Sequence, residues 1–249
     1  MTASISSPPR PGGFTFKQFF VGHDRCGMKV STDGVLLGAW APLPSLPRLL
    51  DIGTGSGLLA LMLAQRLSVN FATFTIDAID IDPLAVEQAK ENVAQSPWSS
   101  QIFVRQQDFL TYQPPARDRY GLIVCNPPYF QHGQSFRDEQ REKARDSRLL
   151  DHRALLQHAA RFLAADGYFS LILSRLEAEQ FADYAQSEGW FLYQQCDIVE
   201  RESSLSKRRL FTWRRQCCSQ QRSRLVIRNE QGAYSTEFRH LTDDFYLAF

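Results

Sequence analysis

The sequence predicts an α/β fold: a mostly parallel, Rossmann-like sheet with helices on both faces and an antiparallel C-terminal edge. Three observations lead to this prediction. Strand-like and helix-like segments alternate along most of the chain, a glycine-rich loop at 51–57 joins two of them, and consecutive strand-like segments follow near the C-terminus. Consecutive strands with no helix between them pair in antiparallel fashion, which places the predicted edge.

The first part of the chain contains short apolar segments separated by helical patterns. An apolar helix is expected at 35–40, before the first core strand. The expected strands are 48–52, 75–81, 101–105 and 120–125, and the helices between them are 58–67 and 84–94. Pro83 fits the first turn of the helix at 84–94, because no N–H is needed there.

The second part starts with a long segment, 130–150, that is dense in both charge signs. A loop of this length is more often functional than accidental. Next come a helix at 152–165, which Gly167 is expected to end, a strand at 168–173 and a helix at 177–188. Three consecutive strands are expected last, at 190–198, 209–215 and 224–228.

Length and composition indicate one globular domain. The chain has 249 residues, of which 43% are hydrophobic and 22% charged, enough for one sizeable core. Residues 1–13 are rich in Ser, Pro and Gly without an apolar stretch, so a disordered leader is expected here and not a signal peptide. Residues 14–249 are expected to form a single domain, with an N-terminal extension at 14–45 and a core at 46–249.

No membrane or metal-binding feature is expected. No apolar run approaches the roughly 18 residues of a membrane span. The cysteines are odd in number and lack the paired spacing of a metal site: Cys26, Cys125, Cys196, Cys217 and Cys218. The five histidines also lack metal-like spacing. We therefore expect a reduced, cytoplasmic protein that binds neither a metal nor a membrane.

A glycine-rich loop follows the first core strand and opens a helix, with the sequence Asp51-Ile52-Gly53-Thr54-Gly55-Ser56-Gly57. Ligands of open α/β sheets bind at the carboxyl ends of the strands, where this loop is expected. Gly53, Gly55 and Gly57 would let the backbone turn tightly and approach a cofactor closely. Asp51 would anchor the loop or face the amino group of the cofactor.

Acidic residues stand where the next two strands end. Asp80 closes the second strand and can accept hydrogen bonds from both hydroxyls of a ribose; Asp82 is the alternative, and its other role would be to cap the following helix. Asp108 follows the third strand and can accept a hydrogen bond from the amino group of a cofactor adenine, with Phe109 beside the adenine ring. The alternative role of Asp108 is to cap a turn. Thr32, ahead of the N-terminal helix, completes the predicted cofactor-binding residues.

A motif more specific than the glycine loop, Asn126-Pro127-Pro128-Tyr129, directly follows the fourth strand. Methylation of an amino or amide nitrogen requires its delocalised lone pair to be localised and aimed. The Asn126 side-chain oxygen and the Pro127 carbonyl can accept hydrogen bonds from the two N–H groups of this nitrogen. Pro127 and Pro128 fix the backbone geometry of the motif. Tyr129 can stack on a base that has left its helix. With the glycine loop, this motif predicts a methyltransferase that uses S-adenosylmethionine and acts by positioning and electrostatics.

Charge is distributed unevenly along the chain. The net charge is +1, yet residues 201–228 contain nine Lys and Arg against one acid, Glu202, so this segment carries +8 and the remainder −7. Such a segment can bind phosphate, or it can be the solvated face of two edge strands. The base-directed motif in the same chain favours phosphate contact. The residues predicted to contact RNA are Arg208, Arg209, Arg214 and Arg215.

Further segments carry a more specific pattern: Phe14-Thr15-Phe16-Lys17-Gln18-Phe19, Met28-Lys29-Val30, Thr32-Asp33-Gly34, Leu36-Leu37-Gly38-Ala39-Trp40, Leu225-Val226-Ile227-Arg228, Tyr234-Ser235 and Phe245-Tyr246-Leu247. With the glycine loop and the Asn-Pro-Pro-Tyr motif, they make the chain resemble, from about residue 14 to 249, the bacterial family that methylates N6 of an adenine next to the anticodon of valine tRNA. The resemblance implies a cytoplasmic class I methyltransferase that acts on tRNA without a separate target-recognition domain, with the 14–45 extension on the substrate and cofactor side of the catalytic core.

Other functions remain open from the sequence. Glutamine-N5 protein methyltransferases use a similar motif for an amide nitrogen, and guanine-N2 methyltransferases of ribosomal RNA share the same motif chemistry. A non-catalytic RNA-binding module is a third alternative, although such a protein has no physical need for intact cofactor and amine motifs.

Overall fold

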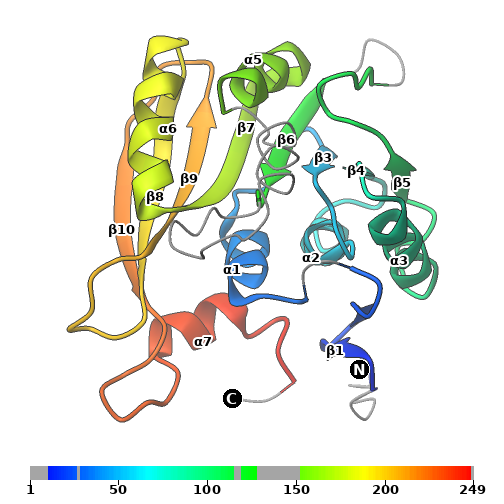
Figure 1. The fold of residues 1–249 in the computed structure, drawn as a ribbon, viewed down its shortest axis with the longest axis horizontal. Coiled ribbons are helices and arrows are strands. Elements are labelled where there is room, and N and C mark those ends of the chain that lie inside the picture. Colours follow the sequence, from blue (N-terminus) through cyan, green and yellow to red (C-terminus); the bar gives the residue numbers. More distant parts are fainter. Residues whose placement is uncertain (1–10, 27–28, 115–118, 128–151, 248–249) are drawn as a thin grey trace, which may run out of the picture.

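The computed structural model describes residues 11–26, 29–114, 119–127 and 152–247. The strands are β1 (Gly13–Thr15), β2 (Phe20–Gly22), β3 (Arg48–Ile52), β4 (Thr75–Asp80), β5 (Ile102–Gln106), β6 (Tyr120–Cys125), β7 (Leu163–Ser174), β8 (Phe191–Val199), β9 (Arg208–Arg214) and β10 (Gln221–Val226). The helices are α1 (Thr32–Trp40), α2 (Leu58–Ser68), α3 (Pro83–Ala94), α5 (His152–Phe162), α6 (Arg175–Ser187) and α7 (Thr236–Thr242). These described residues form an eight-stranded sheet, in the order β10-β8-β9-β7-β6-β3-β4-β5, and a hairpin of β1 and β2 (Figure 1).

The large sheet is mostly parallel, as predicted. Strands β7, β6, β3, β4 and β5 run in the same direction, and β9 is antiparallel to both of its neighbours, β7 and β8. The parallel strands therefore end on one side of the sheet, at Ile52, Asp80, Cys125 and Ser174. We call this side the carboxyl edge, and it is where ligands bind in folds of this class.

The C-terminal strands differ from the prediction in their arrangement. β9 is an interior strand, and β10 pairs in parallel with β8 instead of antiparallel with β9. The physical reason is burial: β9 has four consecutive buried residues, 210–213, a pattern typical of an interior strand that is covered on both faces. β10 is largely exposed, which suits the edge, and it occupies 221–226 instead of the predicted 224–228.

Helices cover both faces of the sheet and enclose two hydrophobic cores. Leu49 and Leu50 are adjacent and fully buried, yet they belong to different cores, because successive strand residues point to opposite faces. The core on one face includes residues of α1, α2 and α7, and the core on the other face includes residues of α5 and α6. This double coverage explains why the central strands are continuous apolar runs in the sequence.

The junction of α5 and β7 corrects a second prediction. The helix ends at Phe162 and β7 begins at the next residue, so the expected helix to 165 and the helix-ending role of Gly167 were wrong. Tyr120 pairs with Leu163 while Leu122 pairs with Tyr168, so residues 164–167 form an irregularity in β7. A Cβ at Gly167 would lie 3.0 Å from the Tyr120 carbonyl oxygen. The glycine therefore permits close strand packing and does not cap a helix.

The N-terminal and C-terminal segments meet on the same side of the molecule, where β1 and α7 lie (Figure 1). The Lys17 N–H donates to the Phe245 carbonyl (2.8 Å), and the Phe14 ring lies 5.6 Å from the Tyr246 ring. Gly13, which was assigned to the disordered leader, pairs with Gly22 in the β1–β2 hairpin, and residues 1–10 lie outside the described residues. The extension thus shares the core of the rest of the chain.

Two features of composition can be compared with the structure. All five cysteines are unpaired. Within the described ranges, no helix has the length and apolar character needed to cross a bilayer, and no three His, Cys, Asp or Glu side chains are grouped as a metal site requires.

A cluster of charged and tyrosine side chains around the buried Asp77 joins neighbouring strands of the sheet, away from the carboxyl edge. The Asp77 side chain is 1% exposed and accepts from Arg48 (3.2 Å), Arg105 (2.7 Å) and the Tyr120 hydroxyl (2.7 Å). Tyr120 also shares a 2.6 Å hydrogen bond with the Tyr112 hydroxyl. Burial raises the pKa of Tyr120 far above its ordinary value, with the hydrogen bonds to Tyr112 and Asp77 as further causes. Asp77 therefore joins β4 to β3, β5 and β6.

We predict that Asp77→Ala lowers the free energy of unfolding by about 3 kcal/mol, the lower end of the range for breaking a buried ion pair, because both arginines keep some solvent contact. Urea denaturation measures the change. Glu179→Ala is the matched control, since it removes the exposed Arg175–Glu179 pair (3.3 Å) and should cost less than about 1 kcal/mol. Equal effects of the two substitutions would contradict the prediction.

Candidate active site

The glycine loop lies at the carboxyl end of β3 and has an unusual backbone. Gly53, Gly55 and Gly57 have φ angles of 69°, 56° and 82°, a left-handed conformation that other residues adopt only with strain. The structure leaves open space where a Cβ would be at Gly53 and Gly55, so the backbone conformation itself requires glycine there. Helix α2 then starts without a side-chain cap on Gly57, so its first N–H groups face the loop region.

Asp80 braces this loop from the neighbouring strand. Its Oδ2 accepts the Gly55 N–H (2.8 Å), and its Oδ1 accepts the Asp82 N–H (3.0 Å). Asp82 instead caps α3, because its side chain accepts the Leu84 N–H (2.9 Å). The two candidates for the ribose thus have different positions: the Asp80 carboxylate lies against the glycine loop and the Asp82 carboxylate lies at the start of a helix.

Asp51 lies beneath the loop at the end of β3. Its carboxyl group is fully buried and accepts a hydrogen bond from the Thr54 hydroxyl (2.7 Å). Burial raises the pKa of Asp51 to about 7; the Thr54 hydrogen bond opposes this increase, and the negative charge of Asp80 adds to it. The Thr54 hydrogen bond ties Asp51 to the loop, and its predicted contact with the amino group of the cofactor remains a prediction.

Asn126 provides an unpaired acceptor next to the loop. It directly follows β6, which is the neighbour of β3 in the sheet. Its Oδ1 is buried and has no hydrogen-bond partner among the described residues, a condition that costs about 1–3 kcal/mol in a folded protein. Pro127 is half-buried. Pro128, Tyr129 and the loop at 130–150 lie outside the described residues, so their predicted roles remain predictions.

Helix α1 brings the N-terminal extension to the same place. A Cβ at Gly34 would lie 2.8 Å from Leu58 Cδ2 and 3.7 Å from Asn126 Nδ2, and one at Gly38 would lie 2.7 Å from Met62 Sδ. These two glycines let α1 pack closely on α2, so the start of α1 lies beside Asn126. Thr32 is the exposed first residue of this helix. Its predicted contact with the cofactor is compatible with that position and remains a prediction.

Asp33 is a residue of the site that the sequence-based prediction missed. It is 6% exposed and forms an ion pair with Arg208 at the start of β9. The pair joins α1 to the C-terminal strands beside Asn126. The Thr32-Asp33-Gly34 segment was noticed only as part of the family resemblance, and its single acid gave no sign of a partner 175 residues away.

The residues after β5 have mixed positions. Asp108 Oδ1 accepts the Leu110 N–H (2.9 Å), so it stabilises a turn, which was the alternative to its predicted adenine contact. The Phe109 ring is 4% exposed and packs against His158 on α5, with 5.8 Å between ring centroids.

Ile81, which directly follows Asp80 at the end of β4, is 65% exposed. An exposed apolar side chain at the carboxyl edge is a candidate for contact with a ligand that the prediction did not include.

The four arginines predicted to contact RNA do not lie together. In the sheet register, Arg208 lies opposite Ser174 at the carboxyl edge, whereas Arg214 lies opposite Phe191 at the other end of β9. The two arginines are six residues apart along the strand, which corresponds to about 20 Å. Arg214 lies over Tyr168 and Tyr193, and Arg215 lies over Trp190. Arg214 and Arg215 therefore lie at the opposite end of β9 from Arg208 and Arg209, and the RNA contact of the four arginines remains a prediction.

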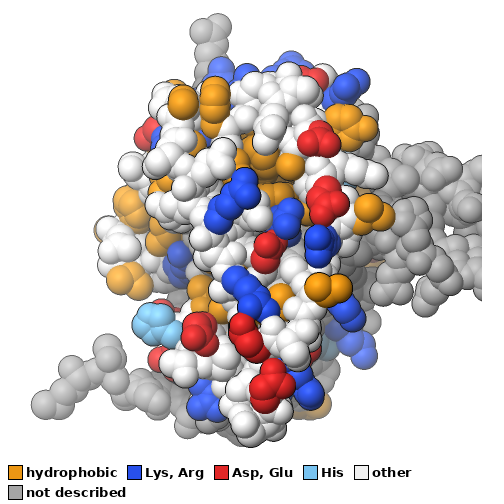
Figure 2. Space-filling model, turned by 90° about the vertical axis from the view of Figure 1, so that its left-hand side faces the viewer, with side chains coloured by type: hydrophobic (Ala, Val, Ile, Leu, Met, Phe, Trp, Pro, Cys, Tyr) orange, Lys and Arg blue, Asp and Glu red, His pale blue; other side chains and the backbone are white. Residues whose placement is uncertain are grey.

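Much of the basic charge of residues 201–228 is neutralised within the fold. Arg208 pairs with Asp33, and Arg209 pairs with Asp197 (2.5 Å). Arg224 and Arg228 form further pairs with Glu202 (2.6 Å) and Glu200 (3.4 Å). On the side of the molecule where β8, β10 and α6 lie, basic and acidic side chains are interspersed (Figure 2). A charge of +8 in the sequence segment thus corresponds to a mixed surface in the structure.

Comparison with known proteins identifies the family. The methyltransferase small domain family matches residues 40–186. A tRNA1(Val) (adenine(37)-N6)-methyltransferase from Pectobacterium carotovorum is 48% identical over 238 residues, which cover 96% of this chain and 95% of the relative. The enzyme of the same name from Citrobacter koseri is 47% identical over 242 residues, covering 97% and 98% of the two chains.

Solved structures support the fold. An Agrobacterium tumefaciens protein described as a predicted O-methyltransferase has a TM-score of 0.63 and 17% identity, covering 86% of this chain and 96% of its own. A glycopeptide N-methyltransferase complexed with S-adenosylmethionine has a TM-score of 0.54 and 13% identity, covering 74% and 95%. These similarities show the class I methyltransferase fold, and the sequence relatives confirm the resemblance noted above. The chain therefore belongs to the tRNA1(Val) (adenine(37)-N6)-methyltransferase family.

Proposed function

We propose that this protein transfers a methyl group from S-adenosylmethionine to the exocyclic N6 amine of an adenine in tRNA, at the position next to the anticodon of valine tRNA. The observation that carries the proposal is the buried Oδ1 of Asn126, which has no hydrogen-bond partner in the described part of the chain and lies beside a left-handed glycine loop. An acceptor in this state suits a substrate N–H donor. The relatives that are 47–48% identical over nearly the whole chain support the choice of tRNA adenine.

The residues present suit the proposed cofactor. The Asp80 carboxylate, held by two backbone N–H groups, can accept hydrogen bonds from neighbouring ribose hydroxyls. The uncapped start of α2 favours a carboxylate group, because the first N–H groups of a helix attract anions. Ile81 offers an apolar surface for an adenine ring. When bound, S-adenosylmethionine supplies an activated methyl group on a positively charged sulfur.

The chain itself contributes orientation and electrostatics. The amine of adenine is a poor nucleophile because its lone pair is delocalised into the ring. Asn126 Oδ1 and the Pro127 carbonyl would accept hydrogen bonds from the two N–H groups of this amine. These bonds would hold the nitrogen in place and stabilise the positive charge that develops on it. No strong base is needed, because methyl transfer gives a cationic nitrogen that is acidic and loses its proton readily. In this proposal Tyr129 stacks on the target base, which must leave its helical stack to enter the site.

The structure changes which basic side chains are the best candidates for RNA contact. Arg208 and Arg209 keep a place near the carboxyl edge, but each has a carboxylate partner. Lys207 and Arg201 belong to the loop between β8 and β9 on the same edge, are exposed, and have no ion-pair partner among the described residues. We therefore propose Lys207 and Arg201 as the first phosphate contacts of this segment. A tRNA substrate also makes the cytoplasm the proposed location.

The product of the reaction is the most direct test of the function. Incubation with labelled S-adenosylmethionine and unmodified total tRNA, followed by digestion, should yield labelled N6-methyladenosine. Label on guanine N2 or on a protein glutamine would contradict the proposal and support one of the two other methyltransferase functions. Absence of cofactor binding in calorimetry would support the non-catalytic RNA-binding module.

Asn126→Ala is expected to reduce turnover by about 100-fold or more, as does the loss of one transition-state hydrogen-bond partner in other enzymes. Affinity for S-adenosylmethionine should stay within about twofold, because the Asn126 oxygen faces the substrate nitrogen. Single-turnover rates and calorimetry measure the two effects. Urea denaturation serves as the control, since removing an unpaired buried oxygen should not lower stability. A variant with full turnover would remove Asn126 from the mechanism.

Asp80→Ala is expected to weaken cofactor binding by at least about tenfold, because each hydrogen bond to a carboxylate contributes about 1.5–3 kcal/mol. Loss of the hydrogen bond to Gly55 should add to this effect. Asp82→Ala is the matched control and should mainly cost stability, about 1 kcal/mol for a lost helix cap. Equilibrium dialysis with labelled cofactor measures both variants. If Asp82→Ala alone weakens binding, the ribose assignment belongs to Asp82.

Replacing Lys207 and Arg201 by Ala is expected to lower tRNA affinity and to flatten its dependence on salt. For each phosphate that the protein no longer neutralises, the slope of log affinity against log salt should fall by about 0.7–0.9. Arg222→Ala is the control for each single substitution, because it also removes one positive charge and Arg222 is exposed near the start of the edge strand β10, away from the carboxyl edge. Filter binding at several salt concentrations measures the slopes. Equal effects of the control and the test variants would rule out a local phosphate site at this edge.

A further inference from the structure

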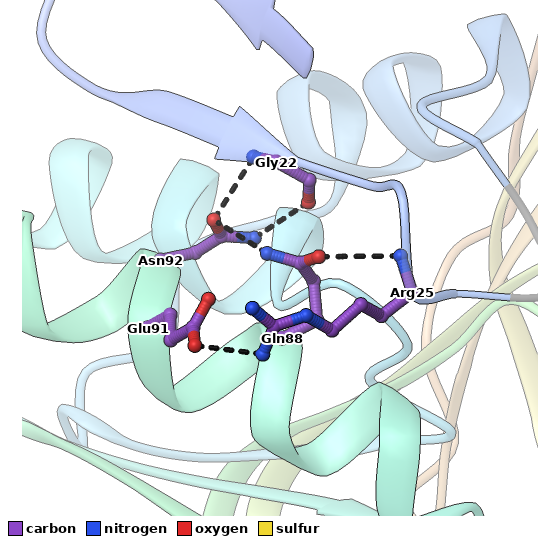
Figure 3. Close-up of polar contacts among 5 residues, drawn as sticks. All are labelled: Gly22, Arg25, Gln88, Glu91 and Asn92. Carbon is purple, nitrogen blue, oxygen red and sulfur yellow. Dashed lines mark hydrogen bonds and ion pairs between the residues drawn. The ribbon is translucent and has the colours of Figure 1, made fainter. Parts of the chain in front are cut away.

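One buried amide connects three parts of the chain near the cofactor residues. Asn92 lies on α3 and is 3% exposed. Its Nδ2 donates to the Gly22 carbonyl and to the Ser56 carbonyl, both at 2.8 Å, and its Oδ1 accepts the Gly22 N–H at 2.9 Å. Figure 3 shows the contacts with Gly22 and with Gln88, whose Nε2 lies 3.4 Å from the same oxygen. Asn92 thus joins α3, the end of β2 and the glycine loop.

The chemistry of this contact requires both halves of an amide. Gly22 presents a buried N–H and a buried C=O, and Asn92 satisfies both at once, as a neighbouring strand would. A Cβ at Gly22 would lie 2.8 Å from Gln88 Nε2 and 3.2 Å from Asn92 Oδ1, so the strand lies close to both amides at this glycine. A carboxylate at position 92 could still accept from Gly22 N–H but could not donate to either carbonyl.

The glycine loop rests on α3 at this point. The Ser56 carbonyl that Asn92 holds belongs to the peptide preceding Gly57, the third left-handed glycine. A Cβ at Gly57 would lie 3.4 Å from Ala89 Cβ, so the loop and the helix are in van der Waals contact. Asn92 therefore fixes the orientation of one peptide of the loop, and Asp80 holds another at Gly55.

The chain that leaves β2 is fastened along the same helix and leads toward the ribose candidates. The Arg25 N–H donates to Gln88 Oε1 (3.4 Å), and the Arg25 guanidinium pairs with Glu91 (2.8 Å) (Figure 3). Cys26 follows. Partial burial raises the pKa of its thiol to about 11, with the negative charges of Asp80 and Asp82 as further causes. The segment that ends at Cys26 is thus held against α3, the helix that directly follows Asp80 and Asp82 in the chain.

We propose that Asn92 is a positioning residue for the cofactor, which holds the Ser56 carbonyl of the glycine loop and the segment Gly22 to Cys26 in one arrangement around the cofactor site. This inference rests on the proposed function, because it assumes that S-adenosylmethionine occupies the loop and Asp80. The arrangement acts on binding. The methyl-accepting group, Asn126, is on a different strand and does not depend on the amide.

The first test compares two residues of α3. Asn92→Asp should raise the KM for S-adenosylmethionine about tenfold, consistent with the net loss of one or two buried hydrogen bonds, while kcat changes less than twofold. Lys90→Gln is the matched control on the same helix, since it also lowers the charge by one but alters only an exposed side chain that has no ion-pair partner among the described residues, and it should leave both constants within twofold. An unchanged KM, or a fall in kcat alone, would overturn the inference.

The second test starts with the unaltered protein, so its main comparison, with and without ligand, does not depend on the folding of a variant. Alkylation of Cys26 at about pH 8.5, followed by peptide mass spectrometry, should become at least threefold slower when S-adenosylhomocysteine is added. Cys217, which is exposed, serves as the internal reference and should react at the same rate in both conditions. In Asn92→Asp, Cys26 should react faster than in the unaltered protein without ligand. A ligand-independent rate at Cys26 would refute the proposed arrangement.

These outcomes separate the inference from the proposed function. If the unaltered protein binds neither S-adenosylmethionine nor S-adenosylhomocysteine, the proposed function fails. If it binds cofactor and methylates tRNA but Asn92→Asp has the KM of the unaltered protein, only the role of Asn92 is lost.

Discussion

The site depends on one constraint: the glycine loop must keep a left-handed backbone at three positions while the rest of the chain holds it still. Gly53, Gly55 and Gly57 make the conformation possible. The Ile79 carbonyl accepts the N–H groups of Gly53 and Thr54 (2.9 and 3.0 Å), so the loop is tied to β4 as well as to β3. Asp80 and Asn92 hold it from two further directions. Its ordering cost is therefore met during folding and does not weaken ligand binding.

Close helix packing extends this arrangement to the ends of the chain. Gly34 and Gly38 let α1 lie against α2, and the Asp33–Arg208 pair then connects α1 to β9. The N-terminal helix α1 and the start of β9 thus converge on the glycine loop and Asn126. Gly34 of α1 lies beside Asn126, and the neighbouring Asp33 is held by Arg208.

Whether a basic side chain near the site is available to a ligand depends on its ion-pair partners more than on the number of charges in the segment. Arg208 and Arg209 have acidic partners, while Lys207 and Arg201 on the same edge have none among the described residues. A paired guanidinium can still meet a phosphate, but it must share or exchange its partner, which lowers the gain. The basic segment therefore has a structural part within the sheet and a smaller part that is available to a polyanion.

The sequence by itself determined the class of fold, the cofactor loop and the amine motif. These features depend on local chemistry: apolar periodicity, glycine at left-handed positions, and acids directly after strands, which placed β3 and β6 without error and β4 to within one residue. Only the tertiary structure decided the interior place of β9, the separation of Arg214 from Arg208, the packing role of Gly167 and the partners of Asp33 and Asn92. Each of these depends on residues far apart in the chain, and no local pattern records which distant group a strand or side chain will meet.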